Sequence, residues 1–235
     1  MKRILLAWSS GKDSAWALHR LRHGGEWEVA GLLTTFNEAF GRVAMHAVRR
    51  QLVEQQAAAA GLPLWPVEIP WPCPNEEYER RMAAACGRAV AQGIGGVAFG
   101  DLFLEDVRAY RERQLAPTGL EPLFPLWRIP TDQLAREMIA GGQRSVITCV
   151  DPGKLDREFA GREIDLQFLR ELPRGVDPCG ENGEFHSFVY AGPEFARPLD
   201  IVVGETVERD GFLFVDVLPA PVAAGAGTQT TIAEP

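Results

Sequence analysis

Apolar runs and amphipathic stretches alternate along the first half of the chain. The run from Ile4 to Trp8 is apolar at every position, which is typical of a parallel strand covered on both faces. The following stretch, Lys12 to His23, ends at Gly24-Gly25, a common stop signal for a helix. Similar patterns predict strands at 4–8, 29–36, 64–69, 95–100 and 122–125, and helices at 12–23, 46–60, 76–92 and 105–114. This alternation predicts an α/β fold with a parallel sheet and helices on both faces.

The pattern changes after Trp127. Further elements are predicted as a helix at 132–140, a strand at 145–150, a helical stretch at 162–171, and strands at 200–207 and 212–217. This mixture predicts a smaller α+β domain packed on the first. We therefore expect one domain over 1–127, a second over 128–218, and a disordered tail over 219–235, which is small, polar and bounded by prolines.

Charge and composition narrow the class of protein. The formal net charge is −8, whereas a nucleic-acid-coating surface needs clustered cations. The four cysteines form no C-x-x-C pair, so neither a cysteine zinc site nor a redox dithiol is expected. No apolar run approaches the roughly 20 residues of a membrane helix, and the short apolar run after the basic start does not fit a signal peptide. We expect a cytoplasmic protein with neither membrane nor nucleic acid as a partner.

In open parallel sheets, ligands bind beyond the carboxyl ends of the strands. The positions that follow predicted strand ends here are Ser9 to Ser14, Thr34 to Asn37, and Gly100-Asp101. These segments are polar or small, in contrast to the apolar runs before them. They are therefore the first candidates for a binding site.

The segment from Ser9 to Ser14 leads directly into a predicted helix. The first amides of a helix lack intrahelical acceptors and carry partial positive charge, so they form a ready anion site. Gly11 allows close backbone approach, and Lys12 adds a positive charge. Hydroxyl donors come from Ser9, Ser10 and Ser14. Together these features predict a phosphate-binding loop.

Three other interpretations of this segment can be compared with the sequence. The common P-loop needs glycine where Leu6 stands and serine or threonine where Asp13 stands, and the dinucleotide fingerprint G-x-G-x-x-G is absent. The remaining alternative is an ordinary helix cap, with Ser10 as N-cap and Asp13 three residues later, as in a capping box.

A second dense polar stretch, DPCGENGEFHSFV, begins at Asp177. Glu181 and Glu184 flank a predicted turn at Asn182-Gly183, and a strand follows from Phe185. Period-two alternation places Glu184 and His186 on one side of this extended segment. Two carboxylates and an imidazole can bind Mg²⁺, hold ammonia or exchange protons, and the alternative is a polar hairpin at a domain junction.

Ser9 to Ser14 also resembles the PP-loop motif, usually S-G-G-x-D-S, of ATP pyrophosphatases. These enzymes split ATP between the α- and β-phosphates and release pyrophosphate. Ser10 stands where the motif normally has its first glycine, a departure that bears on how closely the backbone approaches a phosphate.

Three further segments, in the right order, extend the resemblance to the diphthine–ammonia ligase family. They are AFGDLFLEDVRAYRERQL, GLEPLFPLW and CGENGEFHSFVYAGPEF, and the resemblance spans Met1 to about Leu218. It implies a Rossmann-like domain of the adenine nucleotide α-hydrolase type and a family-specific second domain. It also implies a reaction in which ATP, a carboxylate and ammonia give an amide, AMP and pyrophosphate.

The resemblance further implies ATP and Mg²⁺ as cofactors, ammonia as a substrate, and a small-molecule or protein-borne carboxylate as acceptor. The residue chemistry and the resemblance together give five candidate catalytic residues: Lys12, Asp101, Glu181, Glu184 and His186. The candidate nucleotide-binding residues, taken from the predicted strand ends and from the resemblance, are Ser9, Ser10, Gly11, Lys12, Asp13, Ser14, Thr34, His46 and Gly100, with Asp13 also a metal candidate.

The chain departs from the family pattern at two positions. Members that act on diphthine usually read E-G-G-E-[FY]-E-[TS], whereas Asn182 replaces a glycine here and His186 replaces the third glutamate. This variant resembles a bacterial-type branch, for which we expect the same chemistry on an acceptor other than diphthine.

Several residues and functions keep a second interpretation. Asp101 is equally compatible with a helix N-cap, and His46 with a structural role. Arg108, Arg111 and Arg113 can meet a substrate carboxylate or pyrophosphate, or form a charged helix face. A tRNA-modifying PP-loop enzyme and a nucleotide sensor without turnover are the alternative functions. A homodimer is compatible with the sequence.

Overall fold

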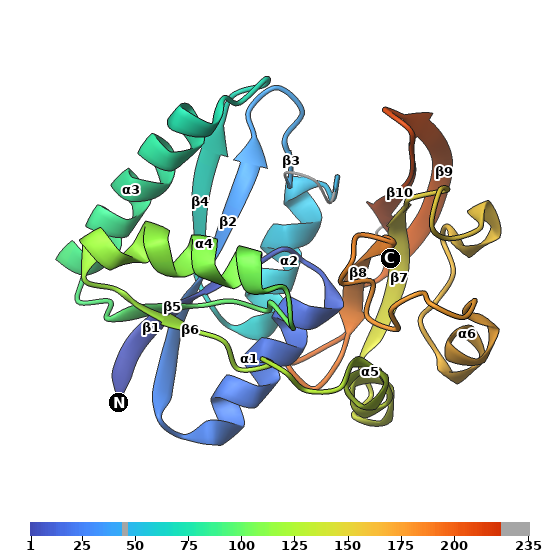
Figure 1. Cartoon of the computed structure of the whole chain (residues 1–235), viewed down its shortest axis with the longest axis horizontal. Helices are drawn as coiled ribbons and strands as arrows, with labels where there is room; N and C mark the ends of the chain where they lie inside the picture. The colour runs from blue at the N-terminus through green and yellow to red at the C-terminus, as the bar shows by residue number, and fades with distance from the viewer. Residues whose placement is uncertain (44–46, 222–235) are drawn as a thin grey trace, which may run out of the picture.

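The computed structural model of the chain describes residues 1–43 and 47–221 and contains two β-sheets that lie side by side (Figure 1). The strands of sheet A are β1 (Lys2–Ala7), β2 (Trp27–Asn37), β3 (Arg42–Val43), β4 (Leu64–Ile69), β5 (Gly96–Ala98) and β6 (Glu121–Leu123). The helices between them are α1 (Lys12–Gly24), α2 (Arg50–Ala60), α3 (Asn75–Ala91) and α4 (Glu105–Leu115), followed by the short 3₁₀ turn η1 (Ala116–Thr118).

Sheet A is parallel except for β3. Strand β1 lies between β2 and β5, while β4 pairs with β2 and β6 pairs with β5. The short β3 pairs antiparallel with the end of β2. The chain thus runs outward from β1 through β2 to β4, then crosses back to β5 and β6, so the strand order reverses beside β1. In open α/β sheets, this switch point is where ligands bind.

Helices cover both faces of sheet A. Ile4 and Leu6 of β1 face one hydrophobic cluster together with side chains of α1 and α2. Leu5, between them, faces a second cluster together with side chains of α3 and α4. Successive side chains of a strand point to opposite faces, so burial on both sides requires the uninterrupted apolar run that the sequence has.

Sheet B is antiparallel, with strand order β8-β7-β10-β9. Its strands are β7 (Arg144–Val150), β8 (Phe185–Ala191), β9 (Ile201–Arg209) and β10 (Phe212–Pro219). The other elements of this part are α5 (Thr131–Ala140), α6 (Leu166–Glu171) and the 3₁₀ turn η2 (Arg157–Phe159). Phe168 of α6 packs edge-on against Phe159 and Phe185 and forms the centre of a separate apolar cluster beneath the sheet.

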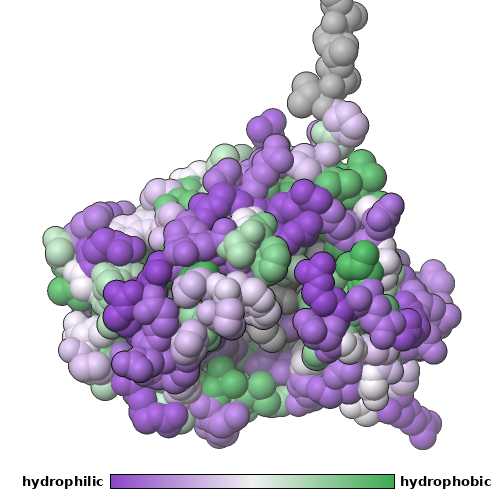
Figure 2. All heavy atoms as spheres, turned by 90° about the horizontal axis from the view of Figure 1, so that it is seen from above, coloured by the Kyte–Doolittle hydropathy of each residue, from purple (hydrophilic) through white to green (hydrophobic). Residues whose placement is uncertain are grey.

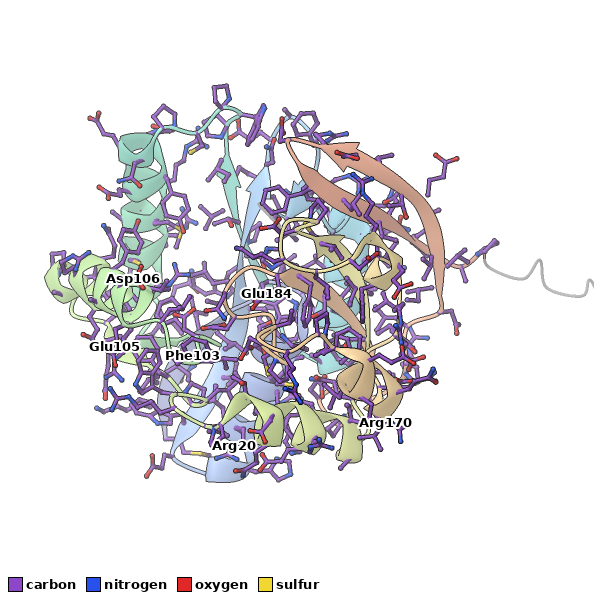
Figure 3. The ribbon with its side chains drawn as sticks, turned by 45° about the vertical axis from the view of Figure 1, so that its right-hand side comes forward. Arg20, Phe103, Glu105, Asp106, Arg170 and Glu184 are labelled. Carbon is purple, nitrogen blue, oxygen red and sulfur yellow. The ribbon has the colours of Figure 1, made fainter. Side chains whose placement is uncertain are left out.

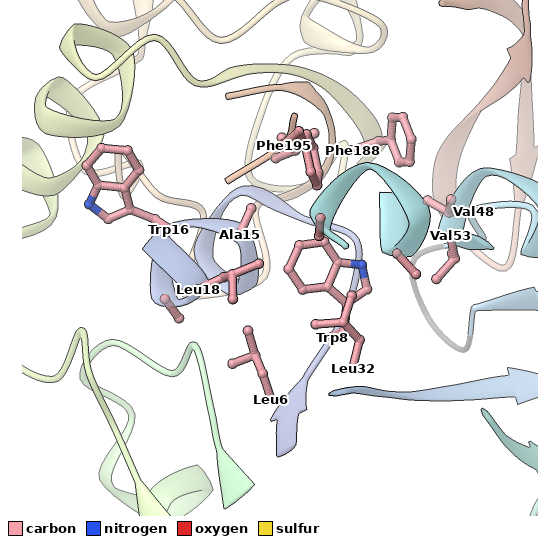
Figure 4. Close-up of a cluster of buried hydrophobic side chains, with 14 of the residues drawn as sticks. Leu6, Trp8, Ala15, Trp16, Leu18, Leu32, Val48, Val53, Phe188 and Phe195 are labelled. Carbon is pink, nitrogen blue, oxygen red and sulfur yellow. The ribbon is translucent and has the colours of Figure 1, made fainter. Parts of the chain in front are cut away.

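The two sheets share part of one core. Phe188 of β8 and Phe195 belong to the same buried cluster as Trp8 and the apolar side of α1, as Figure 4 shows. The rings of Trp8 and Phe195 meet edge to face, with their centroids 6.3 Å apart. Because this cluster continues from one sheet to the other, packing fixes the position of β8 next to the start of α1.

The predicted fold class is confirmed: an α/β, Rossmann-like, mostly parallel sheet stands beside a smaller unit built on an antiparallel sheet. The helix predicted at 162–171 is wrong in its first turn, because α6 begins at Leu166, where the Asp165 carboxylate accepts the Phe168 N–H at 2.7 Å and caps the helix. The strand predicted at 122–125 covers 121–123. The division of the chain at residue 127 stays a prediction.

The helix predicted at 46–60 begins later, at Arg50. Ala47 has a left-handed backbone (φ 57°), which a helix cannot continue, although Val48 after it is buried as the pattern indicated. His46, predicted to bind nucleotide, lies outside the described residues, as does 222–235 of the predicted tail.

The surface seen from above is mainly hydrophilic, with hydrophobic residues in small separate patches (Figure 2). Among the helices of residues 1–43 and 47–221, none is both long enough and apolar enough to span a bilayer.

Candidate functional site

A cleft of about 530 Å³ opens at the switch point of sheet A. Such a volume falls in the range of small-molecule sites. Its polar end contains the 9–14 loop and Gly100-Asp101, which follow β1 and β5 of sheet A. It also contains Glu181, in the loop before β8, and His186, in β8 of sheet B. Its apolar end is lined by side chains of sheet A, α3 and α4, which include Leu33, Val97, Met82, Cys86 and Leu115.

The 9–14 loop turns from β1 into the first turn of α1. Gly11 is the N-cap and no side chain caps the helix, so the capping-box interpretation of Ser10 is wrong. The Gly11 N–H donates to the Ser9 hydroxyl at 3.4 Å, and the Lys12 N–H donates to the Ser187 hydroxyl at 3.2 Å. Both contacts are long for hydrogen bonds. A charged phosphate oxygen would be the stronger acceptor for these amides.

Ser10 holds the loop in an unusual conformation. Its φ is +71°, the left-handed region that favours glycine, which explains why the motif that this loop resembles has glycine here. The Ser10 carbonyl accepts the Val189 N–H at 3.0 Å and the side-chain amide of the fully buried Gln56 at 3.1 Å. Gln56 also donates to the Val189 carbonyl and accepts the Trp8 indole N–H. Together these bonds fix β8 to the loop.

Ser10→Gly is expected to raise the free energy of unfolding by about 1–2 kcal/mol. Glycine removes the cost of a positive φ and of a hydroxyl that is fully buried and, within the described part of the chain, makes no hydrogen bond. The greater freedom of glycine in the unfolded chain offsets part of this gain. Urea unfolding measures the change. Ser10→Ala, which keeps the positive φ, should gain less, and a glycine variant no more stable than wild type contradicts the argument.

Gly100 lets the end of β5 approach the 9–14 loop. A Cβ atom at this position would lie 3.0 Å from both the Asp13 carbonyl carbon and the Ser14 amide nitrogen. These are backbone atoms of the first turn of α1, which cannot rotate away as a side chain can. Glycine at the strand end therefore sets how close Asp101 comes to the loop.

Lys12 is a buried cation, with only 4% of its surface exposed. Its ammonium group donates to Asp13 at 2.8 Å and to the carbonyl of Cys179. Burial alone would lower the pKa of Lys12, but the Asp13 carboxylate beside it holds the pKa above its ordinary value. The side chain is therefore charged at neutral pH and joins α1 to the loop before β8.

The 177–184 loop is closed by its own carboxylates. Asp177 accepts the N–H groups of Cys179 and Glu181 at 2.8 and 3.2 Å and the Thr131 hydroxyl at 2.7 Å. Glu184 accepts the Asp177 N–H at 3.0 Å and the Asn182 side-chain amide at 3.1 Å. Figure 3 shows Glu184 near the middle of the molecule. Its carboxylate is buried within the loop and is not part of the cleft lining.

Glu181, by contrast, reaches across to sheet A. Its carboxylate accepts the N–H of Leu102, the residue directly after Asp101, at 2.8 Å. Burial raises the pKa of Glu181 to about 7, and the nearby carboxylates of Asp13 and Asp101 act in the same direction, while the Leu102 N–H and Lys12 oppose the shift. A carboxyl group that titrates near neutral pH can give and take protons there, which is what an acid or base catalyst needs.

His186 and Cys179 also line the cleft. Burial lowers the pKa of His186 to about 4, and the charge of Lys12 lowers it further, so the imidazole is neutral at pH 7. Burial raises the pKa of the Cys179 thiol, which donates to the Thr131 carbonyl at 3.5 Å and is therefore a poor nucleophile.

The structure brings most of the predicted site residues together. The cleft is lined by Ser9, Gly11, Lys12, Asp13, Ser14, Gly100, Asp101, Glu181 and His186. Ser10 and Glu184 lie behind it, and Thr34 donates its hydroxyl to the Trp8 carbonyl, so its neighbour Thr35 lines the cleft instead. Sequence reasoning missed Ser187 and Gln56, whose contacts depend on the pairing of distant segments.

Within residues 1–43 and 47–221, no group of three or more His, Cys, Asp or Glu side chains is arranged to hold a metal ion. Asp13 nevertheless has one buried carboxylate oxygen without a hydrogen bond in this part of the chain, whereas the corresponding oxygen of Asp101 lies 3.5 Å from the Nε of Arg111, a cation that would repel a metal ion. A single carboxylate oxygen such as that of Asp13 suits a Mg²⁺ ion that takes its other ligands from phosphate and water.

The fold and cleft define an α/β protein with a cleft at the switch point of its parallel sheet, bordered by a loop that leads into a strand of a second sheet. Family models described as the diphthamide synthase N-terminal and C-terminal domains match residues 1–122 and 130–217. The chain belongs to this family of ligases, as the resemblance in the sequence predicted.

Three curated relatives illustrate the similarity, and each is a diphthine–ammonia ligase. The zebrafish (Danio rerio) protein is 30% identical over 186 residues, which cover 72% of this chain and 72% of the relative. The mouse (Mus musculus) protein is 30% identical over 132 residues, 53% of this chain and 48% of the relative. The human (Homo sapiens) protein is 24% identical over 238 residues, 92% of this chain and 88% of the relative.

Proposed function

We propose that this chain is an ATP-dependent amide ligase that adenylates a substrate carboxylate, releases pyrophosphate and transfers ammonia to the acyl group. The observation that carries the proposal is one cleft that joins a helix-start loop with Lys12 to a carboxyl group, Glu181, that titrates near pH 7. The first feature suits phosphates, and the second suits proton transfer from an attacking amine.

In the proposed binding mode, the apolar end of the cleft takes the adenine and the 9–14 loop takes the phosphates. The amides of Gly11 and Lys12 exchange their long hydroxyl contacts for phosphate oxygens, and the Lys12 ammonium neutralises developing charge. Mg²⁺, held mainly by phosphate oxygens beside Asp13, would supply further charge neutralisation.

The bond changes follow from this placement. An oxygen of the acceptor carboxylate attacks the α-phosphorus, and the bond to the bridging oxygen of the β-phosphate breaks, which frees pyrophosphate. The nitrogen of ammonia then attacks the acyl carbon, the bond between that carbon and the AMP oxygen breaks, and the nitrogen passes a proton to Glu181. The neutral His186 borders the same end of the cleft. Asp101 adds a second carboxylate there that can hold the ammonium ion before its deprotonation.

The departures at Asn182 and His186 lead us to propose an acceptor other than diphthine. Asn182 contributes to loop closure by its bond to Glu184, and His186 introduces an uncharged ring where the relatives' motif has a carboxylate. Membership of a bacterial-type branch, a cytoplasmic location and a homodimer stay predictions.

A product assay tests the proposal. The protein is incubated with ATP, Mg²⁺, ammonium and a panel of carboxylic acids, and adenine nucleotides are separated by chromatography while pyrophosphate is measured enzymatically. AMP and pyrophosphate in equal amounts, dependent on one acid, are expected. ADP instead of AMP contradicts the proposal, and bound nucleotide without turnover on any acid favours a sensor.

A further inference from the structure

Arg111 of α4 lines the cleft at the side of Asp101. Its guanidinium carbon lies 5.0 Å from the centroid of the Phe99 ring, and its Nε lies 3.5 Å from the nearer oxygen of Asp101. Both Nε and that oxygen are buried, and neither makes a hydrogen bond within the described residues. The Arg111 side chain as a whole keeps 30% of its surface accessible, so other atoms of the side chain are exposed.

The two neighbouring arginines of α4 are not part of the cleft lining. Arg108 donates to Glu112 at 2.8 Å and stacks over Phe124 and Trp127, with 4.8 Å from its guanidinium carbon to each ring centroid. Arg113 is exposed. Arg111 is thus the arginine of this helix that lines the cleft. Its guanidinium lies over the Phe99 ring, and its ion pair with Asp101 is too long to be a strong hydrogen bond.

The charges of the cleft leave Arg111 open to an incoming anion. Lys12 contacts Asp13 and the Cys179 carbonyl at the phosphate-loop end of the cleft, where the proposed binding mode assigns its charge to the nucleotide phosphates. A guanidinium presents a planar set of donors that matches a carboxylate with two parallel hydrogen bonds. Stacking on Phe99 and the contact with Asp101 pre-orient the group, which lowers the entropy cost of capturing a ligand.

We propose that Arg111 is the binding residue for a carboxylate group of the acceptor, so that the cleft has two anion subsites: the 9–14 loop for nucleotide phosphates and Arg111 for the acid. This rests on the proposed function. It defines the acceptor as an acid whose carboxylate docks beside α4, on the same side of the cleft as Asp101. Acids that cannot place a carboxylate beside Arg111 while the nucleotide is bound are excluded as substrates.

The test separates the two subsites with simple probes. Acetate, succinate and glutarate are titrated into the nucleotide-free protein, and ATP, AMP and pyrophosphate are titrated separately, by calorimetry or NMR. Wild type is expected to bind at least one carboxylate probe, and Arg111→Gln should weaken it about tenfold or more, as expected for the loss of a charged hydrogen-bonded pair. Arg113→Gln makes the same charge change on the same helix and should leave every affinity within about twofold.

Other outcomes overturn the proposal. If Arg111→Gln weakens ATP and pyrophosphate but leaves AMP and the carboxylates unchanged, Arg111 belongs to the pyrophosphate site. If no carboxylate probe binds wild type, the subsite does not exist.

Arg111→Lys, which keeps the charge next to Asp101, is the conservative control: it should retain the fold and recover part of the carboxylate affinity. A wild type that binds carboxylates but no nucleotide would contradict the proposed function and leave the Arg111 subsite standing.

Discussion

Replacing Lys12 with methionine is expected to weaken ATP binding about 10- to 100-fold and to lower turnover about 100- to 1,000-fold. Methionine keeps most of the side-chain length and removes the ammonium group that contacts Asp13 and the Cys179 carbonyl. In the proposed binding mode this group neutralises phosphate charge, so the loss should be larger for ATP than for AMP. Calorimetric titration of the two nucleotides measures the difference.

Loss of Lys12 also affects folding, and the experiment has to separate the two effects. The variant leaves Asp13 without its cation and a buried carbonyl without its donor, so its free energy of unfolding should fall by about 1–3 kcal/mol in urea titrations. Lys154→Met is the matched control, because Lys154 donates to the Asn182 carbonyl at 2.9 Å and supports the same 177–184 loop from outside the cleft. Its nucleotide affinity should stay within about twofold of wild type. A folded Lys12→Met protein that binds ATP like wild type would remove the loop from the proposed phosphate site.

Local sequence patterns were sufficient to predict most of the strands and helices and the fold class, because the burial of each side chain limits which residue types can occupy its position. The apolar run at Ile4 to Trp8 required covering on both faces, and clusters on both sides of β1 supply it. The position of the 9–14 loop at the switch point followed from the same alternation, since parallel strands present their carboxyl ends on one edge. The order of the strands, and the position of sheet B relative to sheet A, did not follow from local patterns.

What the sequence missed depends on contacts between distant segments. The Lys12 N–H meets the Ser187 hydroxyl across 175 positions, and Gln56 meets the Val189 carbonyl across 133. A local pattern in the sequence does not indicate which distant residues form such hydrogen bonds. The sequence likewise did not indicate whether Thr34 or Thr35 lines the cleft. Adjacent residues of a strand face opposite sides, and both residues are threonine. Thr34 turns inward because the Trp8 carbonyl lies 3.0 Å from its hydroxyl.

Glu184 shows how a pattern can identify a segment and still leave the role of its residues open. The sequence predicted two glutamates close to a turn and a strand from Phe185, and β8 does begin at Phe185. Only the folded structure shows that the two glutamates differ in role. Glu181 accepts the Leu102 N–H at the cleft, whereas Glu184 accepts hydrogen bonds from the Asp177 N–H and the Asn182 side-chain amide within the loop. The predicted catalytic role of Glu184 stays a prediction, and its geometry favours loop closure.

With Glu181 as the proton acceptor, kcat/KM for ammonia should rise with pH through about 7 and then level off. The reason is that burial and the neighbouring carboxylates hold the pKa of Glu181 at about 7, so its basic form becomes the major one only above that pH. The assay uses the acid that yields AMP in the product screen and keeps the concentration of free ammonia constant at each pH. That correction removes the titration of ammonium itself from the profile.

Glu181→Gln isolates the proton transfer from the anchoring role of this side chain. Glutamine keeps an oxygen for the Leu102 N–H, so the loop should stay in place while turnover falls about 100-fold or more and the rise near pH 7 disappears. Lys154→Met, which leaves this carboxyl group and its charged neighbours intact, should keep the wild-type profile. Lys12→Met should keep a rise but at a higher pH, because the charge of Lys12 lowers the pKa of Glu181. A Glu181→Gln protein with the wild-type profile would assign the proton transfer to another group.

The same carboxyl group predicts a pH dependence of stability whose sign is opposite to that of a salt-bridged acid. Its pKa is raised from 4.5 in the unfolded chain to about 7 in the folded protein, so between these values the folded state binds more protons than the unfolded state. This contribution to stability is therefore fully present below about pH 4.5 and is lost as the pH rises through 7. Urea unfolding of wild type and Glu181→Gln at pH 6 and pH 8 compares the two directly. The free energy of unfolding of wild type should fall relative to the variant over this interval, and a constant difference would show that Glu181 titrates at its ordinary pKa and cannot serve as the base near neutrality.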